Sequence, residues 1–475
     1  MLARFGAPIP AGAAAPDPRT RLPAAALVGL AIVAAAAFGA ALPEQPLAAL
    51  ALVALVPLAF GAPVASLGVL LVLTAVVPFD VQNRLAFIGG EDAPGLLIVD
   101  LLVVLALCRV ALLGWTGKLR GEVPLLVAGA LGLVLAVLLV EGVVRGAELS
   151  EAGHEARRLG MGVAGFILVW PILRRESLRR PLYGVLLGLG LVIGVWGLAQ
   201  WFFSVGFTAG GDVGVRPGVD LTSSGRGSLQ GGLYAFPVAV TLAFTALVSR
   251  GVRTVEVRFL LAAILLLNGL CLLLTYERTF WVATGVACLM AALRSGPEAR
   301  RAALAWGALG AVTLLLSLAV LGELQTAVER LTSVTQYGTD ESLEYREVET
   351  SNVAQAITER PLTGSGLGAT ITWGKQGVFG EQTTPFSHNG YLWLAWKMGV
   401  PAAILLVLLI GMAVIRTGPV EDERLRMLRT GSQASLLALL LIGVTFPPFN
   451  AFGITAVMGV LAAACFQPRP GSPAG

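Results

Sequence analysis

Long apolar runs, separated by short connections that carry most of the charges, constrain the fold of this chain more than any other feature. Residues 123–144 read VPLLVAGALGLVLAVLLVEGVV, with Glu141 as the single charged residue. A helix needs about 20 such residues to cross the hydrocarbon core of a bilayer. Over 475 residues the chain is 56% hydrophobic and 13% charged, against about 25% charged residues in soluble domains. We therefore predict an integral membrane protein embedded in a lipid bilayer.

The apolar runs predict an all-α fold, a polytopic bundle of about 12–14 transmembrane helices, where the lower number applies if short pairs such as 46–79 are re-entrant. Each predicted span is one apolar run bounded by polar or charged residues. The first seven runs lie near residues 22–42, 46–61, 63–79, 95–113, 123–144, 158–173 and 181–203. The other seven lie near residues 231–249, 257–275, 279–293, 301–322, 391–416, 431–446 and 448–466.

Arginine and lysine alternate between dense and sparse connections, and dense connections face the cytoplasm in membrane proteins. This rule places both termini in the cytoplasm. The N-terminus could be taken for a cleaved signal, since Arg21 precedes an apolar run with the small residues AFGAAL, but the run continues as one span of a multi-pass chain. The resulting organisation is a cytoplasmic arm (1–21), a transmembrane bundle (22–322), a large external loop that contains His388 (323–390), C-terminal transmembrane helices (391–466) and a cytoplasmic tail (467–475).

The large external loop is not disordered by composition. The segment DESLEYREVETSNVAQAITERP begins with acidic residues, places Val353 and Ile357 four residues apart, and stops at Pro361. This pattern predicts an amphipathic helix over the membrane face. The glycine-rich turn PLTGSGLG follows, and because it lacks the GxGxxG spacing a nucleotide site is not favoured.

Three groups far apart in the sequence are predicted to face the same external side: Arg226, Arg278 and His388. Arg278 joins two apolar runs with almost no loop, so it either snorkels, pairs with Glu277, or meets an anion. Arg226 lies in a glycine and serine run, where it either binds an anion or is an idle loop residue. His388 precedes a tryptophan-rich helix; it can take a proton near neutral pH, or it is an interfacial residue like the aromatic belt beside it.

Other polar residues in apolar surroundings are assigned structural roles. Asp100 and Glu141 are predicted to face the bundle interior, because a carboxylate facing lipid is costly. His154, in a predicted external loop at 145–157, is expected to be a solvated surface residue. The four cysteines lie in apolar runs without CxxC spacing, so neither disulfides nor a zinc site are expected. No outward acidic pair has the spacing of a hard-cation site, which predicts chemistry without a metal, and the net charge of +4 does not imply a nucleic-acid partner.

The segment HNGYLWLAWKMG resembles the signature of the O-antigen ligase and polymerase family, a His followed by Asn, Ser or Gln, then nine residues and a Gly. The matching residues here are His388, Asn389 and Gly399. Upstream, YREVETSNVAQAITERPLTGSGLG is similar to the same family's approach to that motif, an Arg and a short helix leading to Pro and a G-x-G-x-G turn. These are Arg346, Pro361, Gly364, Gly366 and Gly368.

The resemblance implies a metal-independent membrane glycosyltransferase with a GT-C-like helical fold and no cofactor. Such an enzyme, in the bacterial cytoplasmic membrane, takes a glycan from undecaprenyl diphosphate on the external face and transfers it to lipid A core or to another glycan. Carried over by position, Arg226 and Arg278 would hold the diphosphate, while His388 would activate the acceptor hydroxyl or orient the phosphate. The family often has a Pro-Asn pair after the first arginine, whereas LQGGLYAFP follows Arg226 here.

Two alternatives stay open at this point. A polymerase that joins lipid-linked repeat units would use the same residues as a ligase, and a transporter of lipid-linked glycans would also need many spans, although the chain shows no internal repeat.

One geometric expectation concerns Gly399. In a regular helix it would lie about 16 Å along the axis from His388 on nearly the same face, leaving room for a lipid tail or a neighbouring helix.

Overall fold

The computed structural model describes residues 55–76, 97–116, 122–203, 233–249, 254–332, 341–375, 379–418, 420 and 422–466. The predicted N-terminal arm, the first predicted span, the C-terminal tail and Arg226 lie outside these residues. Expectations for those segments stay predictions.

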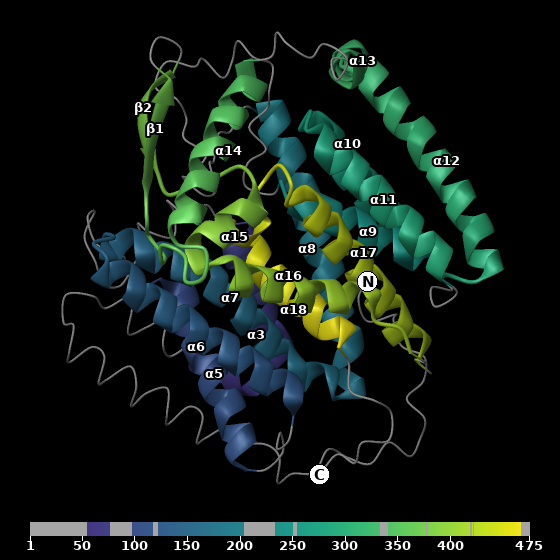
Figure 1. The fold of residues 1–475 in the computed structure, drawn as a ribbon. Helices are drawn as coiled ribbons and strands as arrows, with labels where there is room; N and C mark the ends of the chain where they lie inside the picture. Colours follow the sequence, from purple (N-terminus) through teal and green to yellow (C-terminus); the bar gives the residue numbers. More distant parts are fainter. Residues whose placement is uncertain are drawn as a thin grey trace.

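The described residues form a helical bundle with one small hairpin (Figure 1). In the first part of the chain the helices are α3 (Pro63–Ala75), α5 (Ile98–Trp115), α6 (Val123–Val144), α7 (Leu149–Leu173), α8 (Glu176–Phe203), α9 (Ala235–Val248), α10 (Val255–Leu274), α11 (Arg278–Arg294) and α12 (Pro297–Val320). Then follow α13 (Leu324–Thr332), α14 (Glu341–Glu359), strands β1 (Ile371–Lys375) and β2 (Phe379–Thr384), and helices α15 (Gly390–Met398), α16 (Val400–Ile415), α17 (Glu423–Ile442) and α18 (Ile454–Cys465). A short 3-10 helix, Pro448–Asn450, precedes α18.

The bundle confirms the predicted fold class. Six of the described helices are long and apolar enough to cross a membrane, and four shorter apolar helices accompany them. Few residues of α6 and α12 are buried within the chain, as expected where side chains face lipid tails. The total number of spans stays a prediction, because part of the chain lies outside the described residues.

The interior of the bundle is formed around α7, α9, α17 and α18. Every residue of α9 is buried, and it packs between α8, α10, α11 and α17. Helices α7 and α18 approach so closely that a Cβ atom at Gly162 would lie 3.2 Å from the carbonyl oxygen of Thr455. Small residues at such crossings allow the backbone contact that holds membrane helices together.

Connections that the charge pattern placed on opposite sides of the membrane gather at opposite ends of the bundle. At one end, Arg145 after α6 bonds the glycine-rich turn, and Tyr276 before α11 donates to Glu323 at 2.7 Å. At the other end, Arg174 pairs with Glu122 at 2.7 Å, and Arg179 lies 3.7 Å from Asp422. The described connections named here thus lie in two groups, one at each end of the bundle. Which end faces the cytoplasm stays a prediction.

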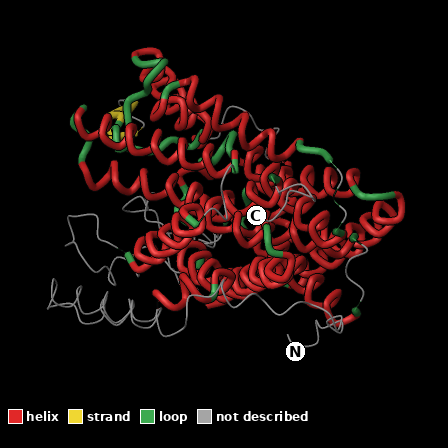
Figure 2. The backbone as a smooth tube through the Cα atoms, turned by 90° about the horizontal axis from the view of Figure 1, so that it is seen from below, coloured by secondary structure: helices red, strands yellow, loops and turns green. Residues whose placement is uncertain are grey.

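The segment between α12 and α16 adds features at the end of the bundle that holds Tyr276 and Glu323. The helix predicted in this segment is present as α14. An antiparallel hairpin, β1–β2, was not predicted; Ile371 pairs with Thr384 and Thr372 with Thr383. The hairpin lies at an edge of the bundle, beside α14 (Figures 1 and 2).

Two sequence-based expectations are wrong. The apolar run 391–416 is not one regular helix, because α15 ends at Met398 and α16 begins at Val400, with Gly399 between them at φ +79°. The 16 Å separation expected along a regular helix therefore does not apply. His154 does not lie in a loop: α7 begins at Leu149, and His154 is half-buried in its second turn.

Candidate active site

His388 lies at the entrance to α15, and its neighbour Asn389 begins that helix. The side-chain oxygen of Asn389 accepts hydrogen bonds from the backbone N–H groups of Tyr391 and Leu392, at 3.0 and 3.1 Å. An N-cap of this kind satisfies amides that have no partner within the helix and stabilises a helix by about 1 kcal/mol. Asn389, a residue of the signature, therefore fixes where α15 begins and so where His388 is presented.

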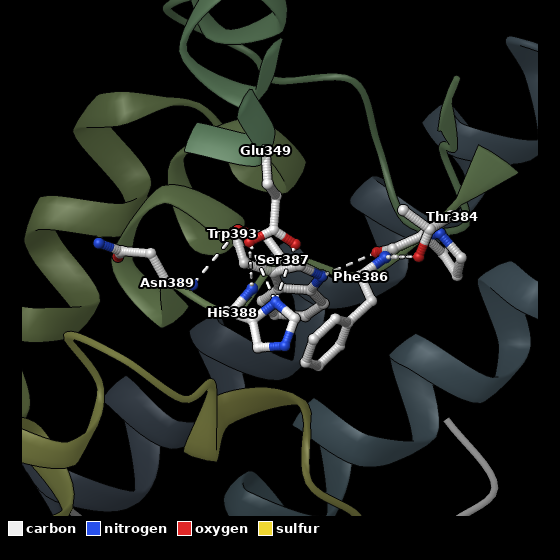
Figure 3. Close-up of polar contacts among 8 residues, drawn as sticks. Glu349, Thr384, Phe386, Ser387, His388, Asn389 and Trp393 are labelled. Carbon is white, nitrogen blue, oxygen red and sulfur yellow. Dashed lines mark hydrogen bonds and ion pairs between the residues drawn. The ribbon is translucent and has the colours of Figure 1, made fainter. Parts of the chain in front are cut away.

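Glu349 on α14 holds the imidazole of His388 (Figure 3). Both carboxylate oxygens of Glu349 lie 3.1 Å from Nδ1 of His388, and one of them also accepts the backbone N–H of His388 at 3.2 Å. Glu349 is 2% exposed, while a quarter of the His388 side chain is accessible. A buried carboxylate requires hydrogen-bond donors, and His388 supplies them.

The tautomer of His388 follows from this contact. A carboxylate accepts hydrogen bonds, so in the neutral ring Nδ1 carries the proton and Nε2 presents its lone pair. In Figure 3 the Nε2 edge of the ring points away from Glu349. This is the arrangement in which a carboxylate orients a histidine that accepts a proton at its other nitrogen.

Aromatic rings fix the orientation of the His388 ring. Phe386, Tyr345 and Phe446 meet it edge-on, with ring centroids 5.1, 5.9 and 6.4 Å away. These rings come from three parts of the chain, and such edge-to-face pairs are worth about 0.5–1.5 kcal/mol beyond the area that they bury. The ring of His388 is thus restrained from several sides as well as by Glu349.

Phe446 connects the site to Arg346 on α14 and to the first turn of α11. The guanidinium of Arg346 on α14 lies 5.5 Å from the centre of the Phe446 ring, within the range of a cation–π contact. On the other side, Phe280 meets Phe446 edge-on at 5.2 Å. Phe280 is two residues after Arg278, the first residue of α11, so the predicted arginine lies at the helix end that adjoins the histidine site.

The backbone before Arg278 is unusual. Tyr276 has φ +55°, and it is the single described residue other than glycine with a positive φ. Non-glycine residues in this conformation cost about 1–3 kcal/mol and are often found at functional sites. The conformation of Tyr276 turns the chain sharply from α10 into α11. Within the described part of the chain, the half-buried side chain of Arg278 forms neither an ion pair nor a hydrogen bond.

The glycine-rich turn of the signature is a packing device. Gly364, Gly366 and Gly368 have φ values of +73°, +85° and +78°. A Cβ atom at Gly366 would lie 2.5 Å from Cα of Gly142 on α6, and one at Gly368 would lie 2.6 Å from the backbone nitrogen of Ala152 on α7. The glycines therefore let the loop before the hairpin lie directly on two helices.

A buried ion pair anchors the same turn to α15. Nζ of Lys397 lies 2.8 Å from Oε1 of Glu155 on α7 and donates to the carbonyl of Ala369 at 2.5 Å. The second oxygen of Glu155 accepts the N–H of Gly368 at 2.6 Å. The two side chains are 0% and 1% exposed, so this pair joins α7, the turn and α15 where water is excluded.

The other predicted polar residues have structural partners. Asp100 pairs with Arg157 at 3.0 Å, which agrees with an interior structural role, and Glu141 pairs with Arg145, the residue that follows α6. The described cysteines, all four of the chain, are free thiols. No three His, Cys, Asp or Glu side chains of the described residues come together in a way that could hold a metal ion. Metal independence of the reaction stays a prediction.

Sequence reasoning missed Glu349, Phe446, Lys397 and Glu155. Glu349 is one of four glutamates between residues 341 and 349, and only its position on the buried face of α14 distinguishes it. The sequence around Lys397 did indicate a buried ion pair, since a lysine in the middle of a tryptophan-rich apolar run needs an anionic partner. Its partner is too distant in sequence to be recognised.

Comparison with known proteins supports the resemblance. Residues 261–407 match the family model described as O-antigen ligase. This range contains Arg278, Arg346, Glu349, His388 and Gly399, whereas Arg226 precedes it. No curated protein matches the chain. The family match and the helical bundle together support a multi-pass membrane enzyme of the O-antigen ligase or polymerase type.

Proposed function

We propose that this chain, whose residues 261–407 match the O-antigen ligase model, is a glycosyltransferase of the bacterial cytoplasmic membrane. It transfers a glycan from undecaprenyl diphosphate to a hydroxyl of an acceptor glycan on the external face. Neither a metal nor a cofactor takes part. The observation that carries the proposal is the contact of His388 with the buried Glu349, within the matched region.

His388 acts as the general base. Glu349 holds the proton on Nδ1, so Nε2 is available to accept the proton of the acceptor hydroxyl. The hydroxyl oxygen then forms a bond to the anomeric carbon of the donor. The bond between that carbon and the diphosphate oxygen breaks, and undecaprenyl diphosphate leaves with the electron pair.

Arg278 and Arg346 stabilise the charge that develops on the leaving diphosphate. Arg346 lies against the ring of Phe446, which contacts Phe280, and Arg278 is the first residue of the helix that carries Phe280. Two guanidinium groups bind phosphate oxygens through paired hydrogen bonds, and Arg278 is held at a helix N-terminus, which also favours an anion. Arg226 would be a third arginine that binds the diphosphate, as the resemblance implies.

A ligase is preferred to a polymerase because the matched family is described as O-antigen ligase. The two activities differ in the acceptor, lipid A core or another surface glycan in one case and a lipid-linked repeat unit in the other. Sizing of the product separates them, because a polymerase generates a ladder of lipid-linked lengths. A transporter would have no need for a histidine oriented by a buried carboxylate.

The decisive experiment incubates the purified chain with a polyprenyl-diphosphate glycan and a candidate acceptor, and measures release of polyprenyl diphosphate. We expect release in the wild type and its loss in His388→Ala and Arg278→Ala, with both variants folded. Full activity of either variant would remove that residue from the site. Absence of release, together with transbilayer movement of the lipid-linked glycan, would instead establish a transporter.

A rescue experiment tests whether His388 is a base or a phosphate ligand. Added imidazole should restore part of the activity of His388→Ala, because the small base can occupy the space of the missing ring. Rescue by imidazole but not by a guanidinium compound of similar size supports proton transfer. The reverse pattern would show that the histidine serves as a cationic ligand of the diphosphate.

A further inference from the structure

A polar cavity of about 790 Å³ lies beside the candidate active site. Its walls come from the turn between α6 and α7, the second half of α14, the glycine-rich turn and the hairpin β1–β2. The volume falls within the range of about 300–1,000 Å³ that small-molecule sites occupy. None of the residues assigned above to proton transfer or to the diphosphate lines this cavity.

The cavity carries the functional groups that bind sugars. Amides of Asn352 and Gln355, the hydroxyl of Thr370 and the carboxylates of Glu151 and Glu359 face it. Hydroxyl groups of a saccharide are donors and acceptors, so a wall of amides, hydroxyls and carboxylates can satisfy them. The amide nitrogen of Asn352 already donates to the carbonyl of Val348 at 2.7 Å, which leaves its oxygen as an acceptor.

The charge of the cavity disfavours a diphosphate. Its lining has three glutamates, Glu148, Glu151 and Glu359, against two arginines, Arg145 and Arg360. Arg145 is already engaged, since it pairs with Glu141 and donates to the carbonyl of Gly364. A phosphate anion would face an excess of carboxylates, whereas a neutral saccharide would not.

The cavity begins one helical turn from the catalytic contact. Asn352 follows Glu349 by three residues on α14, a rise of about 4.5 Å, and Pro385 in the cavity wall precedes His388 by three residues. Strands β1 and β2 form part of the cavity wall, whereas α11, which begins at Arg278, lies on the other side of α14 and α15 in Figure 1. His388 therefore lies between the polar cavity and the arginines.

We propose that this cavity binds the acceptor, an uncharged saccharide chain whose reacting hydroxyl extends to His388. The proposal rests on the proposed function, and it assigns donor and acceptor to opposite sides of the histidine. It also predicts the selectivity of the site, because the excess of carboxylates in the lining should disfavour acceptors that carry acidic sugars near the reacting unit.

Direct binding tests the cavity without relying on turnover. Binding of lacto-N-neotetraose, a neutral tetrasaccharide, and of its sialylated derivative would be measured on the purified full chain by ligand-observed NMR. The neutral sugar should bind at least tenfold more tightly than the acidic one. The variant Gln355→Ala/Glu359→Ala should lose at least tenfold in affinity for the neutral sugar. Glu347→Ala, at an exposed position of the same helix outside the cavity, should bind as the wild type does.

The outcomes separate this inference from the proposed function. Equal binding by the wild type and the cavity variant, or no binding of the neutral sugar to the wild type, would overturn the cavity assignment whatever the enzyme does. Cavity-dependent binding in a chain that never releases polyprenyl diphosphate would keep the saccharide site and reject the transferase. In an active enzyme, the cavity variant should raise the KM for the acceptor and leave the KM for the donor unchanged.

Discussion

Replacing Glu349 with Gln should reveal how much of the activity of His388 depends on its buried carboxylate. The change keeps the shape of the side chain and an oxygen that can accept from Nδ1, but it removes the charge. Glu349 accepts from both the ring and the backbone N–H of His388, at 3.1 and 3.2 Å. Hydrogen bonds to a charged group contribute about 1.5–3 kcal/mol. At about 1.4 kcal/mol for each tenfold change, the rate of transfer should fall by about 10- to 150-fold.

The lower rate of transfer in Glu349→Gln should appear in kcat, and it should appear only when His388 is present. His388→Ala alone should cost about 10²- to 10⁴-fold, the usual contribution of a general base. Adding Glu349→Gln to His388→Ala should change the rate little further, because groups that act as a unit are not additive. The assay is release of polyprenyl diphosphate at saturating donor and acceptor, with Glu347→Gln on the exposed face of α14 as the matched control.

Two results would refute this reasoning. If Glu349→Gln were fully active while His388→Ala were inactive, the carboxylate would not orient the ring. If the two changes lowered the rate additively, Glu349 would act through something other than His388. Thermal unfolding of each purified variant distinguishes both cases from loss of the fold, since Gln at this position retains the volume of the buried side chain.

Further variants test the arginine and the packing around the motif. Arg278→Lys should raise the KM for the donor and lower kcat, because an ammonium group cannot make the paired contacts of a guanidinium group; unchanged kinetics would show that only a point charge is needed. Gly399→Ala should lower the free energy of unfolding by at least about 2 kcal/mol, because a Cβ atom there would collide with the backbone of Leu362. The control is Gly411→Ala on α16, where a Cβ atom meets open space. Thermal unfolding should show no such loss for this control. Lys397→Met should destabilise the chain by about 3–5 kcal/mol, because it leaves the charge of Glu155 uncompensated. The double variant Lys397→Met/Glu155→Gln should recover part of this loss. A double variant as unstable as Lys397→Met would contradict this account.

The sequence predicts the helices of this chain well because their apolar runs are long and their ends are marked. Prolines occupy the first turns of α6 and α12, and Asp422 caps α17, all recognisable start signals. The break between α15 and α16 also had a signal, the Gly399-Val-Pro401 sequence. The continuous hydrophobicity of the run outweighed it in a prediction based on span length.

The candidate site could be predicted only in part. His388, Asn389 and the glycine turn form a local pattern, so a motif reveals them. Glu349 is 39 residues from His388, and its role depends on which face of α14 packs inward, which a helix with apolar residues on several sides does not specify. The polar cavity combines residues from 142–151 with residues from 352–396, which are far apart in the sequence, and the hairpin in its wall has no strong alternation of apolar residues.

The glycine turn has a consequence for the order in which the molecule is completed. Gly368 contacts Glu155 across 213 residues of sequence, and Lys397 reaches the same carboxylate from even further along. When α6 and α7 enter the membrane during synthesis, Glu155 therefore has neither of these partners, and the surface that receives the turn is uncovered. Contacts between such distant segments form slowly, because the intervening chain must first be ordered. The nascent protein must protect a carboxylate in its N-terminal half until the signature helix has been made, and the histidine site is among the last parts of the molecule to form.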